Sequence, residues 1–161
     1  MENLSEIIVK TLKNKNETIS FMESCTGGFL ANEITNIDGS SNVLKVSLVT
    51  YSSEYKIKFG VDENVINTKG VYSNFTSQEM AEKISGFAGS NWGIGITGEL
   101  GNVGTDRCVG PAANIVYYSI YNSNTQKTLS NSIIAKGKTR EERKKFVAEE
   151  IFGELCRIIK N

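Results

Sequence analysis

The segment TISFMESCTGG, residues 18–28, decides the fold class. Its first five residues, 18–22, form a short run rich in β-branched and apolar side chains, which is typical of a buried strand. Small polar residues and two glycines follow, and apolar residues then recur with helical spacing over 29–37. This order predicts a strand, a tight turn and a helix. Backbone N–H groups in such a turn suit an anion such as phosphate, although a plain strand-to-helix turn fits the same residues.

The alternation of helices and strands extends outward from this segment through most of the chain. The spacing of apolar residues predicts helices over 3–15, 53–59, 62–67 and 76–88, with one more from near Thr139. Further strands are expected over 47–52, 92–98 and 114–121, with a last strand ending at 133–135. The last two strands predict a hairpin. We therefore expect one domain over residues 1–161, a three-layer α/β/α sandwich with a mixed, mostly parallel sheet.

The charge balance argues against nucleic acid and membrane partners. Lys plus Arg and Asp plus Glu number 18 each, so the formal net charge is zero and no strong field favours DNA, RNA or anionic lipid. No apolar run approaches the roughly 20 residues of a membrane span. The first residues also lack the basic and apolar regions of a signal peptide. We expect a cytoplasmic protein.

The chain contains no histidine, which restricts the chemistry that it can carry out. Its three cysteines, Cys25, Cys108 and Cys156, form no CxxC pair. A zinc site is therefore not expected, and we predict no cofactor. A Ser-His-Asp or Cys-His centre is excluded, so a hydrolase of this sequence needs a lysine or a carboxylate as its base.

Polar residues follow three of the predicted strands. They are Glu23 to Thr26, Tyr51-Ser52 and Thr97-Gly98. In open α/β sheets, ligands bind beyond the carboxyl ends of the strands. We therefore expect these three segments to converge on one crevice.

The segment 39–56 contains serines, a tyrosine and a lysine that suggest a Ser/Lys centre. We expect a helical turn near 42–46 and a strand from near Ser47 to Ser52, which would fold Ser41 back toward Lys56. The alternative is that the serine caps a helix, the lysine is solvated and the tyrosine packs.

Five motifs in order and spacing resemble the CinA C-terminal domain family over nearly the whole chain. They are ESCTGG at 23–28, GSS at 39–41, VTYS at 49–52 with Lys56, GVYS at 70–73 and GITG at 95–98. That family includes nicotinamide mononucleotide amidohydrolases, which release ammonia and nicotinic acid mononucleotide in pyridine nucleotide salvage. The resemblance implies a three-layer α/β/α fold, a small-molecule nucleotide substrate and self-association, so a homodimer is expected.

The resemblance also implies a set of site residues. It assigns Ser41 as the nucleophile and Lys56 as the base, and it adds Tyr51, Thr97 and Arg140 as catalytic residues. Arg140 is expected to bind the phosphate or to help keep Lys56 neutral. The remaining positions are expected to bind substrate: Ser24, Cys25, Thr26, Gly27, Ser40 and Gly98.

Two alternatives remain open beside this assignment. Cys25 lies at a predicted helix start, where a thiol can act as a nucleophile, with Glu23 and Lys56 completing a Cys-Glu-Lys amidase. The loop 98–113 departs from the family's glycine-rich pattern. That departure favours a nucleotide-binding module of the same fold that has lost the amidase.

Overall fold

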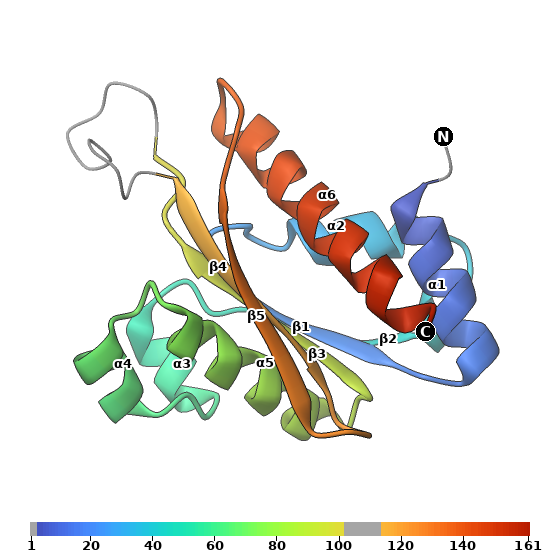
Figure 1. Ribbon diagram of the computed structural model, residues 1–161, viewed down its shortest axis with the longest axis horizontal. Coiled ribbons are helices and arrows are strands. Elements are labelled where there is room, and N and C mark those ends of the chain that lie inside the picture. Colours follow the sequence, from blue (N-terminus) through green and yellow to red (C-terminus); the bar gives the residue numbers. More distant parts are fainter. Residues whose placement is uncertain (1–2, 102–113) are drawn as a thin grey trace.

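The computed structural model describes residues 3–101 and 114–161 (Figure 1). Cys108 and most of the predicted loop 98–113 lie outside these residues. The helices are α1 (Leu4–Lys15), α2 (Phe29–Thr35), α3 (Ser53–Lys58), α4 (Glu63–Lys69), α5 (Asn74–Ala88) and α6 (Arg140–Ile159), with a short 3₁₀ helix, η1, at Ser40–Asn42. The strands are β1 (Ile19–Glu23), β2 (Leu44–Val49), β3 (Trp92–Gly98), β4 (Ile115–Asn122) and β5 (Lys127–Ile134).

The strands form one sheet in the order β2-β1-β3-β4-β5. Strand β1 pairs in parallel with both β2 and β3, whereas β4 runs antiparallel to β3 and to β5. Four of these strands therefore point the same way, and only β4 opposes them. The mixed, mostly parallel sheet and the final hairpin are confirmed.

Helices cover both faces of the sheet. Figure 1 shows α1, α2 and α6 on one face and α3, α4 and α5 on the other, which confirms the three-layer arrangement. The larger apolar core lies under the first group, and a smaller cluster around Met22, Met80 and Ile84 lies under the second. Among the helices that the structure describes, none combines the length and the apolar composition that crossing a bilayer requires.

Glycines in β3 allow α5 to approach the sheet closely. A Cβ atom on Gly93 would lie 2.1 Å from the carbonyl oxygen of Ala81, and one on Gly95 would lie 2.2 Å from that of Ser77. No side chain fits in such a gap. The backbone of α5 therefore packs directly on β3.

Candidate active site

Ser24 and Lys56 meet at the carboxyl ends of two neighbouring strands. The Lys56 side chain is 1% exposed, and its Nζ donates hydrogen bonds to Ser24 Oγ at 3.1 Å and to the Thr50 carbonyl oxygen at 2.7 Å. Ser24 follows β1 and Thr50 follows β2, and these parallel strands pair Glu23 with Val49. The sheet register therefore brings a serine hydroxyl and a lysine amine together.

The buried position of Lys56 changes its protonation. Burial lowers its pKa from 10.5 to about 8, against a smaller opposing effect from Cys25. At pH 7 about a tenth of the Lys56 side chains are then neutral, far more than for an ordinary lysine. A neutral amine within hydrogen-bond distance of a hydroxyl can act as its base.

The Glu23 carboxylate is occupied by the start of α2. It is fully buried, and it accepts hydrogen bonds from the backbone N–H groups of Gly28 at 3.1 Å, Leu30 at 3.3 Å and Ala31 at 3.0 Å. The Thr26 hydroxyl also donates to it, at 2.6 Å. The chain supplies its own carboxylate to these N–H groups, which favours the plain strand-to-helix turn over an external anion there.

Cys25 is held in a form that disfavours nucleophilic attack. Its side chain is buried, and burial raises the pKa of the thiol to about 12, although its backbone hydrogen bond and Lys56 oppose the shift. The thiol therefore stays protonated at neutral pH, and only a thiolate is an effective nucleophile. Since Glu23 is also engaged, this geometry does not favour the Cys-Glu-Lys alternative. Within residues 3–101 and 114–161, no three His, Cys, Asp or Glu side chains form a cluster that could hold a metal.

Ser41 does not reach Lys56 within this chain. Strand β2 begins at Leu44, which pairs with Ile19, so the expected strand start near Ser47 is wrong. Ser40 and Ser41 lie in η1 before this strand, whereas Lys56 lies beyond its other end. At about 3.3 Å per residue, a six-residue strand separates the two ends by more than about 15 Å. Pairing with β1 holds residues 44–49 in an extended strand, whereas the prediction placed a helical turn near 42–46 that would fold Ser41 back toward Lys56.

Tyr51 and Arg140 meet at the rim of the same edge. Tyr51 is 64% exposed, and its hydroxyl accepts a hydrogen bond from Arg140 Nη2 at 3.3 Å. Arg140 Nη1 also donates to the carbonyl oxygen of Leu100, just after β3.

Thr97 and Gly98, two further predicted site residues, lie at the end of β3. Thr97 is buried and donates to the Val71 carbonyl oxygen at 2.9 Å, and Gly98 pairs with β4. Thr97 therefore holds the 70–73 segment beside β3.

Sequence reasoning missed two further cations on α6. Arg143 is 1% exposed and donates to the carbonyl oxygens of Gly101, Gly137 and Lys138. Lys144 places its Nζ 3.2 Å from the position that a Cβ on Gly27 would occupy. Residues three and four positions apart share a helix face, so the predicted Arg140 was a signal that could have pointed to both.

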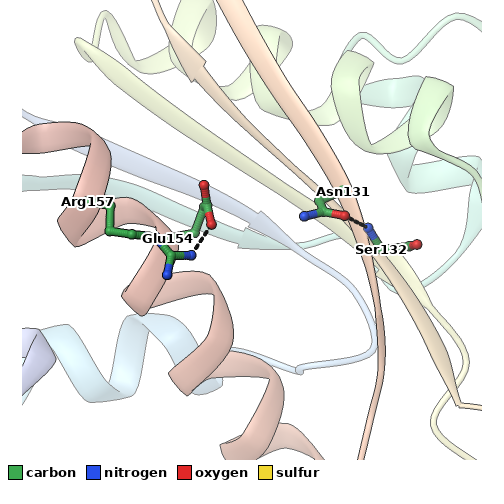
Figure 2. A network of polar contacts seen from close by, with 4 residues as sticks. All are labelled: Asn131, Ser132, Glu154 and Arg157. Carbon is green, nitrogen blue, oxygen red and sulfur yellow. Dashed lines mark hydrogen bonds and ion pairs between the residues drawn. The ribbon is translucent and has the colours of Figure 1, made fainter.

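A separate polar network lies far from this edge. Figure 2 shows the ion pair between Glu154 and Arg157 on α6 and the hydrogen bond from the Ser132 N–H to Asn131 Oδ1 on β5. Glu154 is 14 residues along α6 from Arg140, which is about 20 Å at the helical rise. Strand β5, which carries Asn131 and Ser132, lies three strands across the sheet from β1. These four residues are therefore not part of the candidate site.

The comparisons with known proteins agree with this architecture. A family model described as the CinA C-terminal domain matches residues 1–155. Among curated relatives, a CinA-like protein of Prochlorococcus marinus is 38% identical over 130 residues, covering 79% of this chain and 30% of the relative. A CinA-like protein of Kosmotoga olearia is 39% identical over 123 residues, with coverages of 74% and 29%.

A solved structure matches over almost the full chain. It is the crystal structure of a competence or damage-inducible protein from Enterobacter asburiae, with a TM-score of 0.86 and 25% identity, covering 97% of this chain and 96% of that one. The curated relatives are much longer, since this chain spans less than a third of the two described above.

Proposed function

The chain belongs to the CinA C-terminal domain family, and we propose that it is an amidohydrolase that converts nicotinamide mononucleotide to nicotinic acid mononucleotide and ammonia. The reaction is the one that its motifs imply. The observation that carries the proposal is the hydrogen bond between the Ser24 hydroxyl and the buried Lys56 amine. In this proposal Ser24, and not Ser41, is the nucleophile.

The proposed mechanism uses Lys56 as a proton carrier. Its neutral amine takes the proton of the Ser24 hydroxyl while Oγ attacks the carboxamide carbon and the carbonyl oxygen gains the negative charge. The tetrahedral intermediate collapses when the Lys56 ammonium returns the proton to the amide nitrogen, so ammonia leaves and an ester to Ser24 remains. Water, deprotonated by Lys56, then hydrolyses this ester and restores the serine.

Two observations support Lys56 as this base. Its pKa of about 8 lies close to neutral pH, where a base works best. Its second hydrogen bond, to the Thr50 carbonyl oxygen, fixes the amine beside Ser24. Burial thus supplies the protonation state of Lys56, and the hydrogen bond to Thr50 supplies its orientation.

The test is ammonia release from nicotinamide mononucleotide by the purified protein. We expect the wild type to release ammonia. We expect Ser24→Ala and Lys56→Met each to lower kcat by about 1,000-fold or more, because each removes a group that the chemistry needs. Ser41→Ala is the matched control and should keep most of the activity. If Ser41→Ala or Cys25→Ala abolishes turnover while Ser24→Ala keeps it, the assignment of Ser24 is wrong.

A second candidate is a nucleotide-binding module without amidase activity. It is favoured by the sequence of the predicted loop 98–113, which departs from the family's glycine-rich pattern. Calorimetric binding of nicotinamide mononucleotide with no release of ammonia would support this module over the enzyme.

A further inference from the structure

Thr50 carries a buried hydroxyl at the strand edge where Ser24 and Lys56 meet. Its side chain is 1% exposed, and Oγ1 has no hydrogen-bond partner among the residues that the structure describes. A buried hydroxyl without a partner costs free energy, and a valine would fill the same space without that cost. Packing therefore does not explain the hydroxyl, whereas a small polar molecule that binds to it during the reaction would.

The register of the sheet places the Thr50 side chain on the same face as that of Ser24. The Thr50 N–H donates to the Glu23 carbonyl oxygen at 2.9 Å, so the parallel pairing of β1 with β2 continues as far as Thr50. Side chains alternate between the two faces of a strand. Met22 and Leu48, two positions earlier on the two strands, both pack in the smaller apolar cluster. The Ser24 and Thr50 side chains therefore lie next to each other on the face that α3, α4 and α5 cover (Figure 1).

The Lys56 amine connects these two residues. Its Nζ donates to Ser24 Oγ at 3.1 Å and to the Thr50 carbonyl oxygen at 2.7 Å. The Thr50 hydroxyl belongs to the same residue as that carbonyl, so it also lies near the amine. Two hydroxyls and one amine that can share a small polar molecule are thus gathered at this edge.

We propose that the Thr50 hydroxyl holds the water that hydrolyses the ester to Ser24. This inference deepens the proposed function and rests on it for the ester. The water oxygen forms a bond to the ester carbonyl carbon, passes one proton to the neutral Lys56 amine and donates the other in a hydrogen bond to Thr50 Oγ1. The bond from that carbon to Ser24 Oγ then breaks, and the Lys56 ammonium returns the proton to Oγ.

The Thr50 hydroxyl is needed in the second half of this reaction more than in the first. In the first half, the amide nitrogen is already held by its bond to the carbon that Ser24 attacks. The water has no such bond, so hydrogen bonds alone set its position, and a displacement of about 1 Å can cost about 100-fold in rate. Loss of the hydroxyl should therefore slow hydrolysis of the ester and leave its formation nearly unchanged.

The test is Thr50→Val, which removes the hydroxyl and keeps the branched shape. With nicotinamide mononucleotide, rapid-quench measurements should show a burst of about one ammonia per protein, followed by steady turnover about 10- to 100-fold slower than in the wild type. Intact mass spectrometry of the quenched protein should find the acyl group, and the same protein with Ser24→Ala added should lack it. Thr50→Ser keeps the hydroxyl and should restore most of the turnover, which a packing defect would not allow.

Ser20→Ala is the matched control. Ser20 Oγ is also buried without a partner in the part of the chain that the structure describes, but it lies four residues before Ser24, about 13 Å along the strand. Its loss should change neither the burst nor the steady rate. Thr50→Val should keep the Tm of the wild type or raise it, because it removes an unpartnered buried hydroxyl. A fall in Tm of more than about 5 °C would show that the hydroxyl stabilises the fold, and would overturn the proposal.

The kinetic outcomes separate the role of Thr50 from the amidase itself. Equal slowing of the burst and of steady turnover, or no slowing, would overturn the role of Thr50 even if the wild type releases ammonia. If the wild type releases none, the amidase proposal fails, and 4-nitrophenyl acetate, an activated ester that can acylate Ser24, takes the place of the nucleotide. Acetyl-Ser24 that is lost more slowly from Thr50→Val than from the wild type would then support the role of Thr50. Equal loss from both proteins, or no acylation of Ser24, would overturn it.

Discussion

A single lysine determines the chemistry available at this edge of the sheet. Lys56 is almost fully buried, and its hydrogen-bond acceptors are a hydroxyl and a carbonyl oxygen, both uncharged. A charged amine in such a place costs free energy, and part of that cost is avoided when the amine loses its proton. The same burial that suits Lys56 to the proposed role of base therefore makes it a burden on stability.

This burden predicts a pH-dependent stability difference between the wild type and Lys56→Met. The pKa is about 8 in the folded protein and near 10.5 in the unfolded chain. Below pH 8 both states are protonated and the difference is flat. Between pH 8 and 10.5 the unfolded chain binds more protons, so the unfolding free energy of the wild type should rise relative to the variant by about 1–3 kcal/mol in total. Urea unfolding at pH 7 and pH 10 measures it.

Other titrating groups cancel in this comparison, because both proteins share them. If the difference in unfolding free energy between the wild type and Lys56→Met stays constant from pH 7 to pH 10, Lys56 titrates normally. Turnover should rise over the interval around pH 8, since the proposed base is the neutral amine.

At the scale of an element, α2 depends on a carboxylate from the preceding strand. The helix has only seven residues, too few to be stable alone. Its N-cap residue, Gly28, offers no side chain, and Glu23 binds the first N–H groups instead. A buried side chain thus connects β1 to α2 and fixes the turn that carries Ser24.

Replacing this carboxylate should therefore destabilise the protein. We expect Glu23→Gln to lower the unfolding free energy by about 2–4 kcal/mol, because an amide places N–H donors against backbone N–H groups in a buried site. Chemical denaturation at neutral pH measures the loss. Glu33→Gln, on the same helix, is the control and should change stability by less than about 0.5 kcal/mol. Similar losses in both variants would contradict the role of Glu23.

The β2 strand shows what local sequence leaves undetermined. Its residues LKVSLV alternate as a strand should, yet the start of an edge strand is set by its partner, here Ile19 opposite Leu44. That long-range pairing is not visible in the local sequence. Because of this pairing, Ser41 lies at the opposite end of β2 from Lys56, and Ser24 is the serine whose hydroxyl lies beside Lys56.

At the scale of the whole molecule, the distance between layers depends on two glycines in β3. The α5 atoms closest to a Cβ on Gly93 or Gly95 would be backbone carbonyl oxygens, those of Ala81 and Ser77. We expect Gly95→Ala to cost about 3 kcal/mol or more, because the added methyl group would overlap the Ser77 carbonyl oxygen and force the helix off the sheet. Thermal and urea unfolding report this loss.

Gly86 on the same helix provides the opposite control. A Cβ there would meet no atom within 4 Å, so Gly86→Ala should stabilise the protein by about 0.5–1 kcal/mol through helix propensity. A Gly95→Ala protein as stable as the wild type would show that the layers can separate without cost.

The architecture was more predictable than the site. Alternating helices and strands, the glycine-rich β3 and the final hairpin all follow from local patterns, and the structure confirms them. The position of Tyr51 at one edge with the end of β1 follows from parallel strand ends, whereas Arg140 was implied only by the family resemblance. The Glu23 cap and the Ser24–Lys56 contact could not be predicted, because each depends on side-chain directions that only packing determines.

The Ser24–Lys56 hydrogen bond joins residues 32 positions apart, through two strands that pair in parallel. Local helix formation during folding cannot create this contact, because it exists only after the crossover from β1 to β2 has closed. Parallel pairing of strands that are distant in the sequence is slow compared with the formation of a helix. In a refolding chain, the time at which the Ser24–Lys56 contact forms would therefore report when β1 and β2 have paired. Nascent or partly folded chains, in which these strands are not yet paired, would lack the contact.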